Sequence, residues 1–174
     1  NSDLLIEGIL GKKIIDISAS SLISRGYLTQ PMIKFLDVPK GHVKGSYHSV
    51  YKDYIVENVD RNNLIIKYAK DLSDKNYKTL ILFKQIKHGK ILADMLSNAN
   101  IKFAMLSGKD SLEQRNKVKE DINSGKIQVI LASTIFDIGV DIECLSGLIL
   151  AGGGKSYVRA LQRIGRILRV YPNK

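Results

Sequence analysis

The sequence predicts an α/β fold, a doubly wound parallel β-sheet with helices on both faces. Short apolar runs rich in aliphatic and β-branched residues recur at 79–83, 101–106, 129–132 and 148–151. Longer stretches with the apolar spacing of amphipathic helices separate most of these runs. The runs end in small or polar residues, which is typical of parallel strands whose carboxyl ends open into ligand-binding loops.

Composition narrows the functional classes. The chain has 174 residues, of which 44% are hydrophobic and 25% charged, and this fits one globular domain with an appended segment. The net charge of +10 favours a polyanionic partner, with nucleic acid ahead of an anionic membrane; the alternative is an inert basic surface. Cys144 is the single cysteine, which excludes an internal disulfide framework. Because a signal peptide and a membrane-length apolar run are also lacking, we expect a cytoplasmic or otherwise intracellular protein with no membrane partner.

We divide the chain into residues 1–45, a linker or the end of a preceding domain, and residues 46–174, the domain proper. The first part contains a predicted short helix at 18–23, capped by one of its serines, and a predicted alternating strand at 32–38. The sequence starts within a pattern and without an initiator Met, so we expect an excised fragment.

The domain is predicted to begin with two helices. Residues 46–58 place three tyrosines on one helical face, which covers the core or, less commonly, stacks bases: Tyr47, Tyr51 and Tyr54. The second helix runs to about Lys75 and starts at a polar cap: Asp60, Asn62 or Asn63. The strand at 79–83 is followed by a predicted loop at 84–88 and a predicted helix at 89–98.

The next predicted helix, from Ser111 to about Asn123, carries the clearest terminal signals. Ser111, with Gln114 three residues later, forms a capping-box pattern, and Gly125 ends the helix. Right-handed crossovers then bring every strand-end loop to one edge of the sheet. The predicted edge loops are Lys84–Lys87, Ser107–Lys109, Ser133–Asp141 and Gly152–Lys155.

Several familiar sites are excluded or disfavoured. The run from Gly152 to Ser156 is glycine-rich, but a P-loop needs a glycine where Ile149 stands. A plain turn and a close approach to some phosphate both remain open for that run. No dinucleotide fingerprint, catalytic triad or metal-ligand spacing occurs, so we expect no metal bound by this chain.

The arginines near the end of the chain are more specific. Arg163, Arg166 and Arg169 fall on one helical face directly after the glycine-rich run. No acidic residue lies between Gly152 and Arg169, so local ion pairing is not available to them. A guanidinium matches phosphate oxygens, so this face predicts an external anion.

Four stretches together resemble motifs of superfamily 2 DNA/RNA helicases. Q-R-I-G-R-I-L-R (Gln162–Arg169) resembles motif VI, and A-S-T-I-F-D-I-G-V-D-I (Ala132–Ile142) resembles motif V. T-L-I-L-F (Thr79–Phe83) resembles motif IV, and Leu106–Arg115 is similar to a neighbouring H-G-x-x-x-x-x-x-R motif. The resemblance covers about residues 76–169. Leu22–Pro31 resembles the interdomain segment of the UvsW- and XPB-like branch.

The resemblance implies the second RecA-like domain of a two-domain motor that uses ATP with Mg²⁺. The first domain would bind the nucleotide, since this chain lacks both the P-loop and the acidic box. By position in the motifs, the implied arginine fingers are Arg166 and Arg169, and the implied nucleotide-side residues are Gln162, Gly139 and Asp141. The implied nucleic-acid contacts are Phe83, Lys84, Ser107, Gly108, Ser133, Thr134 and Arg163.

Departures from the motifs refine this prediction. Ser107 stands where many members have His, while Gln162 and Leu168 differ from the RNA-dedicated DEAD-box pattern and favour DNA. The predicted function is therefore the C-terminal motor domain of an ATP-dependent nucleic-acid helicase or translocase, acting on DNA with RNA possible, and inactive alone. The alternatives are a stand-alone nucleic-acid-binding module and the motor subunit of a restriction or remodelling enzyme.

Overall fold

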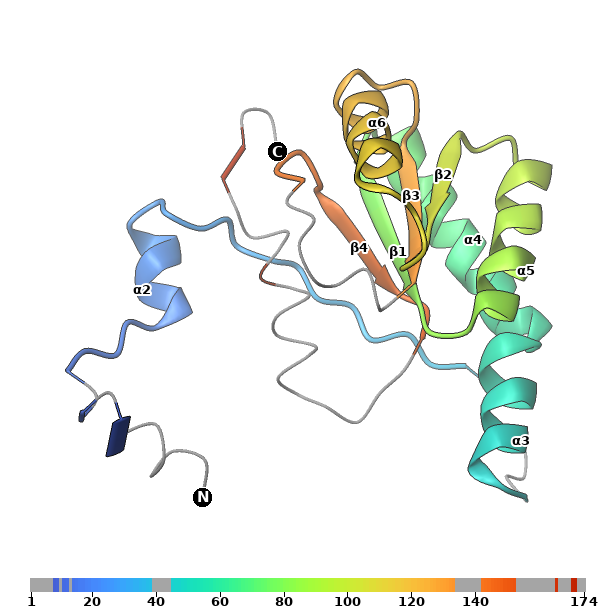
Figure 1. The fold of residues 1–174 in the computed structure, drawn as a ribbon, viewed down its shortest axis with the longest axis horizontal. Coiled ribbons are helices and arrows are strands. Elements are labelled where there is room, and N and C mark those ends of the chain that lie inside the picture. The colour runs from blue at the N-terminus through green and yellow to red at the C-terminus, as the bar shows by residue number, and fades with distance from the viewer. Residues whose placement is uncertain are drawn as a thin grey trace.

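A parallel sheet with helices on both faces forms the body of the molecule in the computed structural model (Figure 1). The structure describes residues 8–9, 11–12, 14–38, 45–133, 142–152, 165 and 170–171. In the described part of the chain, four strands pair in the order β2-β3-β1-β4. The strands are β1 (Thr79–Phe83), β2 (Phe103–Leu106), β3 (Val129–Ser133) and β4 (Gly147–Leu150). The predicted fold class is confirmed.

Alternating side chains give the sheet two apolar layers. Ile81 and Phe83 of β1 lie in one core cluster with Leu92 and Leu96 of helix α5 (Ile86–Asn98). Helix α4 (Val59–Asp74) adds Ile65 and Ala69 to that layer. Leu80 and Leu82 lie in the other cluster, with Ile122 of helix α6 (Leu112–Asn123). Each fully buried aliphatic or aromatic side chain contributes roughly 1.5–3 kcal/mol, so the sheet is held from both sides.

Two helices begin earlier than the sequence predicts. Asn58 caps α4, with its Oδ1 accepting from the backbone N–H of Arg61 at 2.8 Å. The predicted caps Asp60, Asn62 and Asn63 are therefore wrong, because all three lie inside the helix. Helix α5 begins at Ile86, and residues 86–88, predicted as loop, form its first turn.

Residues with positive φ follow both α4 and α6, and the one after α6 is the predicted Gly125. Asn76, just past α4, has φ 61, and Gly125, just past α6, has φ 77. Both are in the left-handed region that commonly ends a helix. The predicted capping box is confirmed, with Ser111 and Gln114 exchanging side-chain and backbone hydrogen bonds at the start of α6.

The tyrosine-bearing stretch before α4 is not one regular helix. It consists of α3 (Tyr47–Tyr51) followed by a π-helical turn, η1 (Lys52–Val56). Tyr51 is 6% exposed and belongs to the core, whereas Tyr47 is 60% exposed. Tyr51 therefore covers the core, whereas the ring of Tyr47 does not and is accessible on the surface.

The N-terminal part, which carries the short helix α2 (Ala19–Ser24), runs outside the sheet as an extended arm (Figure 1). Helix α2 is capped by Ser18, and Gly26 follows it with φ 75. The strand predicted at 32–38 is wrong, since residues 31–38 form no strand and Phe35 is 94% exposed. Alternation alone does not make a strand when no neighbouring strand supplies hydrogen bonds. Among the described helices, none has the length and hydropathy needed to cross a bilayer.

Gly89 gives a test of how tightly α5 packs on β1. An ideal Cβ at position 89 would lie 2.5 Å from Cζ of Phe83 and 2.9 Å from Cε of Met105. We predict that Gly89→Ala lowers the free energy of unfolding by about 1–3 kcal/mol, because both neighbours must move within a filled core. This loss would come despite the higher helix propensity of Ala. Urea unfolding measures the change.

Gly8→Ala is the matched control, since an added Cβ there meets nothing within 4 Å. Unchanged or increased stability in Gly89→Ala would contradict the close contact between α5 and the Phe83 ring.

Candidate functional site at the carboxyl edge of the sheet

Four chain segments reach the same edge of the sheet. The parallel register aligns Phe83 with Ser133, Leu82 with Leu150, and Leu106 with Ala132. The residues at and just past the strand ends therefore lie along one edge, in the sheet order Ser107, Ser133, Lys84 and Ala151–Gly152. This is the edge that the predicted crossovers require, and it is where open α/β sheets bind ligands.

Lys84 is the exposed cation at the centre of this edge. Its Nζ lies 5.6 Å from the ring centroid of Tyr47 and 5.4 Å from that of Tyr51. Nζ also donates to the hydroxyl oxygen of Tyr47 at 3.5 Å. No carboxylate forms an ion pair with Lys84 in the described part of the chain. The cation is thus positioned by aromatic rings and keeps its charge available to an external anion.

Two of the predicted nucleic-acid contacts are buried. Phe83 has no exposed surface, and its ring packs against Gly89 inside the core. The prediction that it contacts nucleic acid is wrong for its side chain, because the alternation along β1 turns it inward. Ser133 is 1% exposed, and its Oγ has no hydrogen-bond partner among the residues described.

The loop containing Ser107 and Gly108 is organised by its own hydrogen bonds. The carboxylate of Asp110 accepts from the backbone N–H of Ser107. Arg115, on α6, donates from Nη2 to the carbonyl oxygen of Gly108 at 3.4 Å. Gly108 is exposed and Ser107 is half-buried. This hydrogen bond explains why the motif places an arginine seven residues after its glycine: Arg115 bonds the turn at Gly108 and keeps it in position.

Gly152 starts its loop in direct contact with the neighbouring strand end. A Cβ at position 152 would lie 2.8 Å from the backbone nitrogen of Lys84. The backbone N–H of Gly152 donates to the carbonyl oxygen of Leu82 at 3.0 Å. Glycine is required here by packing between two backbones, which supports the plain-turn interpretation of the first residue of this glycine-rich run.

A buried polar network beneath this edge was missed by sequence reasoning. Arg61 of α4 donates from Nη2 to the carbonyl oxygen of Ala151 at 2.8 Å and so fixes the end of β4. Asn62 donates from Nδ2 to the carbonyl oxygen of Val56. Its Oδ1 lies 2.9 Å from Nε2 of His88, so that ring nitrogen carries the hydrogen. The only sequence signal was a pair of polar residues on the apolar side of a helix.

Burial controls the protonation of this network. It lowers the pKa of the Arg61 guanidinium, and the nearby Tyr51 opposes that effect. Burial, followed by the positive charge of Arg61, lowers the pKa of His88 to about 4. The imidazole is therefore neutral at physiological pH and acts as a hydrogen-bond donor to Asn62.

The remaining predicted site residues lie outside the described residues. They are Arg166, Arg169, Gln162, Arg163, Gly139, Asp141 and Thr134. Their assignments stay predictions from the motifs, as does the division of the chain at about residue 45.

The sheet order, the helices on both faces and the polar loops at one edge define a RecA-like α/β domain. The model of the family described as helicase conserved C-terminal domain matches residues 60–171. The chain belongs to this family and is a C-terminal domain of the superfamily 2 helicase type. The predicted resemblance to superfamily 2 helicases is confirmed.

Individual relatives agree with this assignment. The ATP-dependent DNA helicase uvsW of Enterobacteria phage T4 is 32% identical over 173 residues, covering 96% of this chain and 34% of the relative. The crystal structure of T4 UvsW aligns with a TM-score of 0.60 and 30% identity, covering 71% of this chain and 25% of that one. The ATP-dependent RNA helicase DRS1 of Phaeosphaeria nodorum is 26% identical over 144 residues, covering 82% of this chain and 17% of the relative. The chain thus spans about a third of the length of this T4 relative.

His88 predicts a pH dependence of folding. Its pKa in the folded chain is about 4, against an ordinary value of 6.5, so the unfolded chain binds more protons between these values. The stability contributed by the neutral imidazole is fully present at pH values above 6.5, the ordinary pKa. It is lost as the pH falls through about 4, the pKa in the folded chain. We expect a loss of at most about 3 kcal/mol, measured as urea unfolding across this window.

The comparison of two histidine variants isolates this effect. His88→Gln retains a donor for Asn62 but cannot titrate, so it should flatten the slope of stability against pH. His48→Gln removes an exposed histidine and should leave the slope as it is. Equal slopes in wild type and His88→Gln would contradict the buried neutral imidazole.

Proposed function

We propose that this chain is the C-terminal motor domain of an ATP-dependent DNA helicase or translocase. In this proposal it grips the nucleic-acid backbone through the carboxyl edge of its sheet. It also supplies arginine fingers to ATP that is bound, with Mg²⁺, mainly by a separate N-terminal RecA-like domain. ATP supplies the free energy for movement along the strand, and the residues of this chain couple that energy to the grip.

The observation that carries the proposal is the shared edge. Lys84, Ser107 and Gly152 follow three different strands and lie along one edge because the strands are parallel. The loop that begins at Gly152 leads directly into the segment with the motif VI arginines. Family membership and the edge geometry thus support one site that faces both a phosphate backbone and a nucleotide.

DNA is favoured over RNA as the partner. The relative that covers 96% of this chain is named a DNA helicase, whereas the RNA helicase relative is less identical and covers 82%. Gln162 and Leu168 also depart from the RNA-dedicated DEAD-box pattern. Contacts made to phosphates are largely independent of sequence, so binding should weaken steeply with added salt.

The arginines are assigned to the transition state. A guanidinium stays charged and offers two parallel donors to phosphate oxygens, which is the geometry that phosphoryl transfer requires. Arg166 and Arg169 are the proposed fingers, and Gln162, Gly139 and Asp141 are proposed to lie on the nucleotide side. Ser133, Thr134 and Arg163 are proposed to connect this side to the nucleic-acid track.

The finger assignment predicts a specific kinetic defect. In a protein that carries this domain together with a P-loop domain, Arg169→Ala should lower ATP hydrolysis by roughly 10³- to 10⁵-fold. Binding of ATP and DNA should stay near wild type, because the lost contact forms mainly in the transition state. Steady-state hydrolysis and equilibrium binding measure the two parts separately.

Two further variants sharpen this test. Arg169→Lys keeps the charge but not the planar fork, so hydrolysis should remain strongly impaired. Lys75→Ala removes an exposed cation just past α4, near the opposite edge of the sheet, and should hydrolyse ATP normally. Near-normal hydrolysis in Arg169→Ala would contradict the finger role and favour the stand-alone binding module.

The chain by itself should not hydrolyse ATP. It contains neither a P-loop nor an acidic Mg²⁺ box, so nothing in its sequence provides the primary nucleotide site. A phosphate-release assay with the pure 174-residue chain, with and without single-stranded DNA, should give only background. ATP hydrolysis above background that co-purifies with the chain through two columns would contradict the proposal that a separate domain binds the nucleotide.

A further inference from the structure

Tyr47 is an exposed aromatic ring that is held in place. It is the first residue of α3, which Ser46 caps through a hydrogen bond to the backbone N–H of Ser49 at 3.3 Å. The ring centroid of Tyr51 lies 5.9 Å away at 39°, and that of His48 lies 5.9 Å away at 75°. With 60% of its surface exposed, Tyr47 offers a ring already oriented by its neighbours.

The cation beside this ring differs from the other lysines nearby. Lys52 and Lys87 both pair with the carboxylate of Glu57, and the hydrogen bond from Lys87 lowers the pKa of that carboxyl group. Lys84 has no such pair in the described part of the chain, and its Nζ lies 5.6 Å from the Tyr47 ring centroid. An oriented ring and a cation free of acids therefore lie next to each other.

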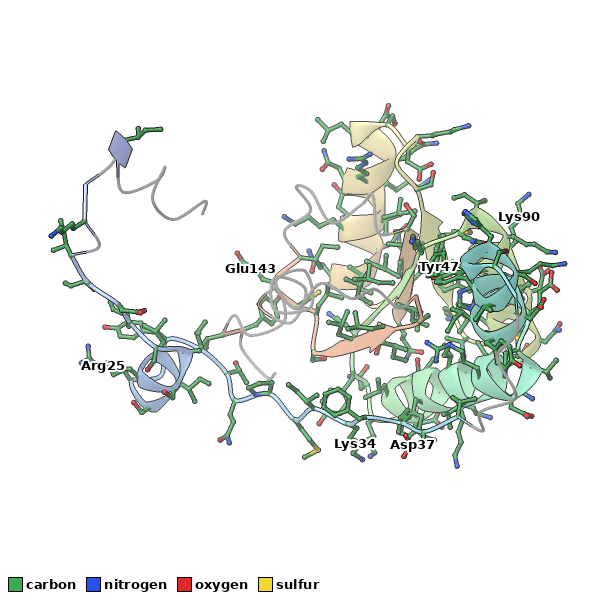
Figure 2. All side chains as sticks on the ribbon, turned by 90° about the horizontal axis from the view of Figure 1, so that it is seen from below. Arg25, Lys34, Asp37, Tyr47, Lys90 and Glu143 are labelled. Atoms are coloured by element: carbon green, nitrogen blue, oxygen red, sulfur yellow. The ribbon has the colours of Figure 1, made fainter. Side chains whose placement is uncertain are left out.

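This pair matches one nucleotide unit of a single strand. A base has an apolar face that stacks on an aromatic ring, and the adjoining phosphate requires a cation. A duplex keeps its bases stacked inside, so only an unpaired strand offers both groups at once. The pair also lies at the edge where the proposed backbone grip is formed, and Figure 2 shows Tyr47 on the side of the molecule that carries Lys90.

We propose that Tyr47 stacks a base of single-stranded nucleic acid while Lys84 binds the adjoining phosphate. This rests on the proposed function and adds a contact to it. Tyr47 lies before the first strand and outside every helicase motif in the sequence. The contact makes the grip of this domain selective for unpaired strands, and it is tolerant of sequence because every base has a face to stack.

The test combines a protein change with a ligand change. Binding of the full chain to a fluorescent oligothymidylate is compared with binding to the same length of abasic DNA, for wild type and Tyr47→Leu. We expect Tyr47→Leu to weaken binding of the normal strand by roughly 5- to 100-fold, and to change binding of the abasic strand little. Tyr47→Phe should bind like wild type, because the ring is retained.

A matched control lies near the opposite edge of the sheet. Tyr77 is 41% exposed and precedes β1, so Tyr77→Leu removes a comparable ring away from the proposed site. It should bind both strands like wild type. Thermal unfolding of each variant should match wild type if these exposed substitutions leave the fold intact.

The lysine has its own readout. Lys84→Gln should reduce the slope of log affinity against log salt by about 0.7, as expected for one lost phosphate contact to a single strand. Tyr47→Leu should leave that slope unchanged. Repeating the series with RNA of the same length distinguishes a deoxyribose strand from a ribose strand as the natural ligand.

Each result has a definite meaning. The stacking contact would be overturned if Tyr47→Leu bound the normal strand as tightly as wild type does. It would also be overturned if the substitution weakened binding of the normal and abasic strands equally. Either result would leave the backbone grip intact. No salt-dependent binding of any strand by wild type would instead overturn the grip itself, and the stacking proposal with it. A loss confined to Tyr47→Leu on the normal strand supports the proposal.

Discussion

The pairing of β1 with β3 on one side and with β4 on the other is the constraint on which this domain depends. All five residues of β1 are buried, and both of its edges carry ladder hydrogen bonds. Because side chains alternate between faces, a slip of one residue would exchange the two core layers. The same slip would move Lys84 out of line with Gly152. One register therefore sets both the packing of the core and the chemistry of the edge.

Apolar burial alone does not fix where an edge loop begins, because the hydrophobic effect has no direction. Directional interactions, the hydrogen bonds of the polar network under the edge, fix where the loop begins. Arg61 holds the carbonyl oxygen of Ala151, and Asn62 connects η1 to His88 of α5. Such buried groups cost free energy unless they are hydrogen-bonded, so they permit few alternative arrangements. The network thus makes the positions of three elements depend on one another.

The sequence was sufficient for the four strands of the sheet, the layers and the shared edge, since continuous apolar runs and crossover handedness determine them. It was insufficient where several residues suited the same local role and tertiary contacts determined which of them takes it. Asn58 and Asn62 are both good cap residues. The structure uses Asn58 as the cap and turns Asn62 inward to His88. Lys87 and His88 are polar enough for a loop, yet both belong to α5, and His88 and Gly89 are buried there. Phe83 was assigned a nucleic-acid contact from motif IV. Its position in the alternation of β1 already indicated that its side chain faces the core.

The two tasks proposed for the edge lie one backbone contact apart. In the proposed function, Lys84 is assigned to the nucleic-acid side, and Gly152 precedes in sequence the arginines assigned to the nucleotide side. These two strand ends touch through backbone atoms, with no room even for a Cβ between them. Side chains can absorb a displacement by changing rotamer, but two backbones in contact cannot. Under the proposed function, a shift of Lys84 toward a bound phosphate must therefore be felt at Gly152, which gives the motor a short and stiff path between its two ligands.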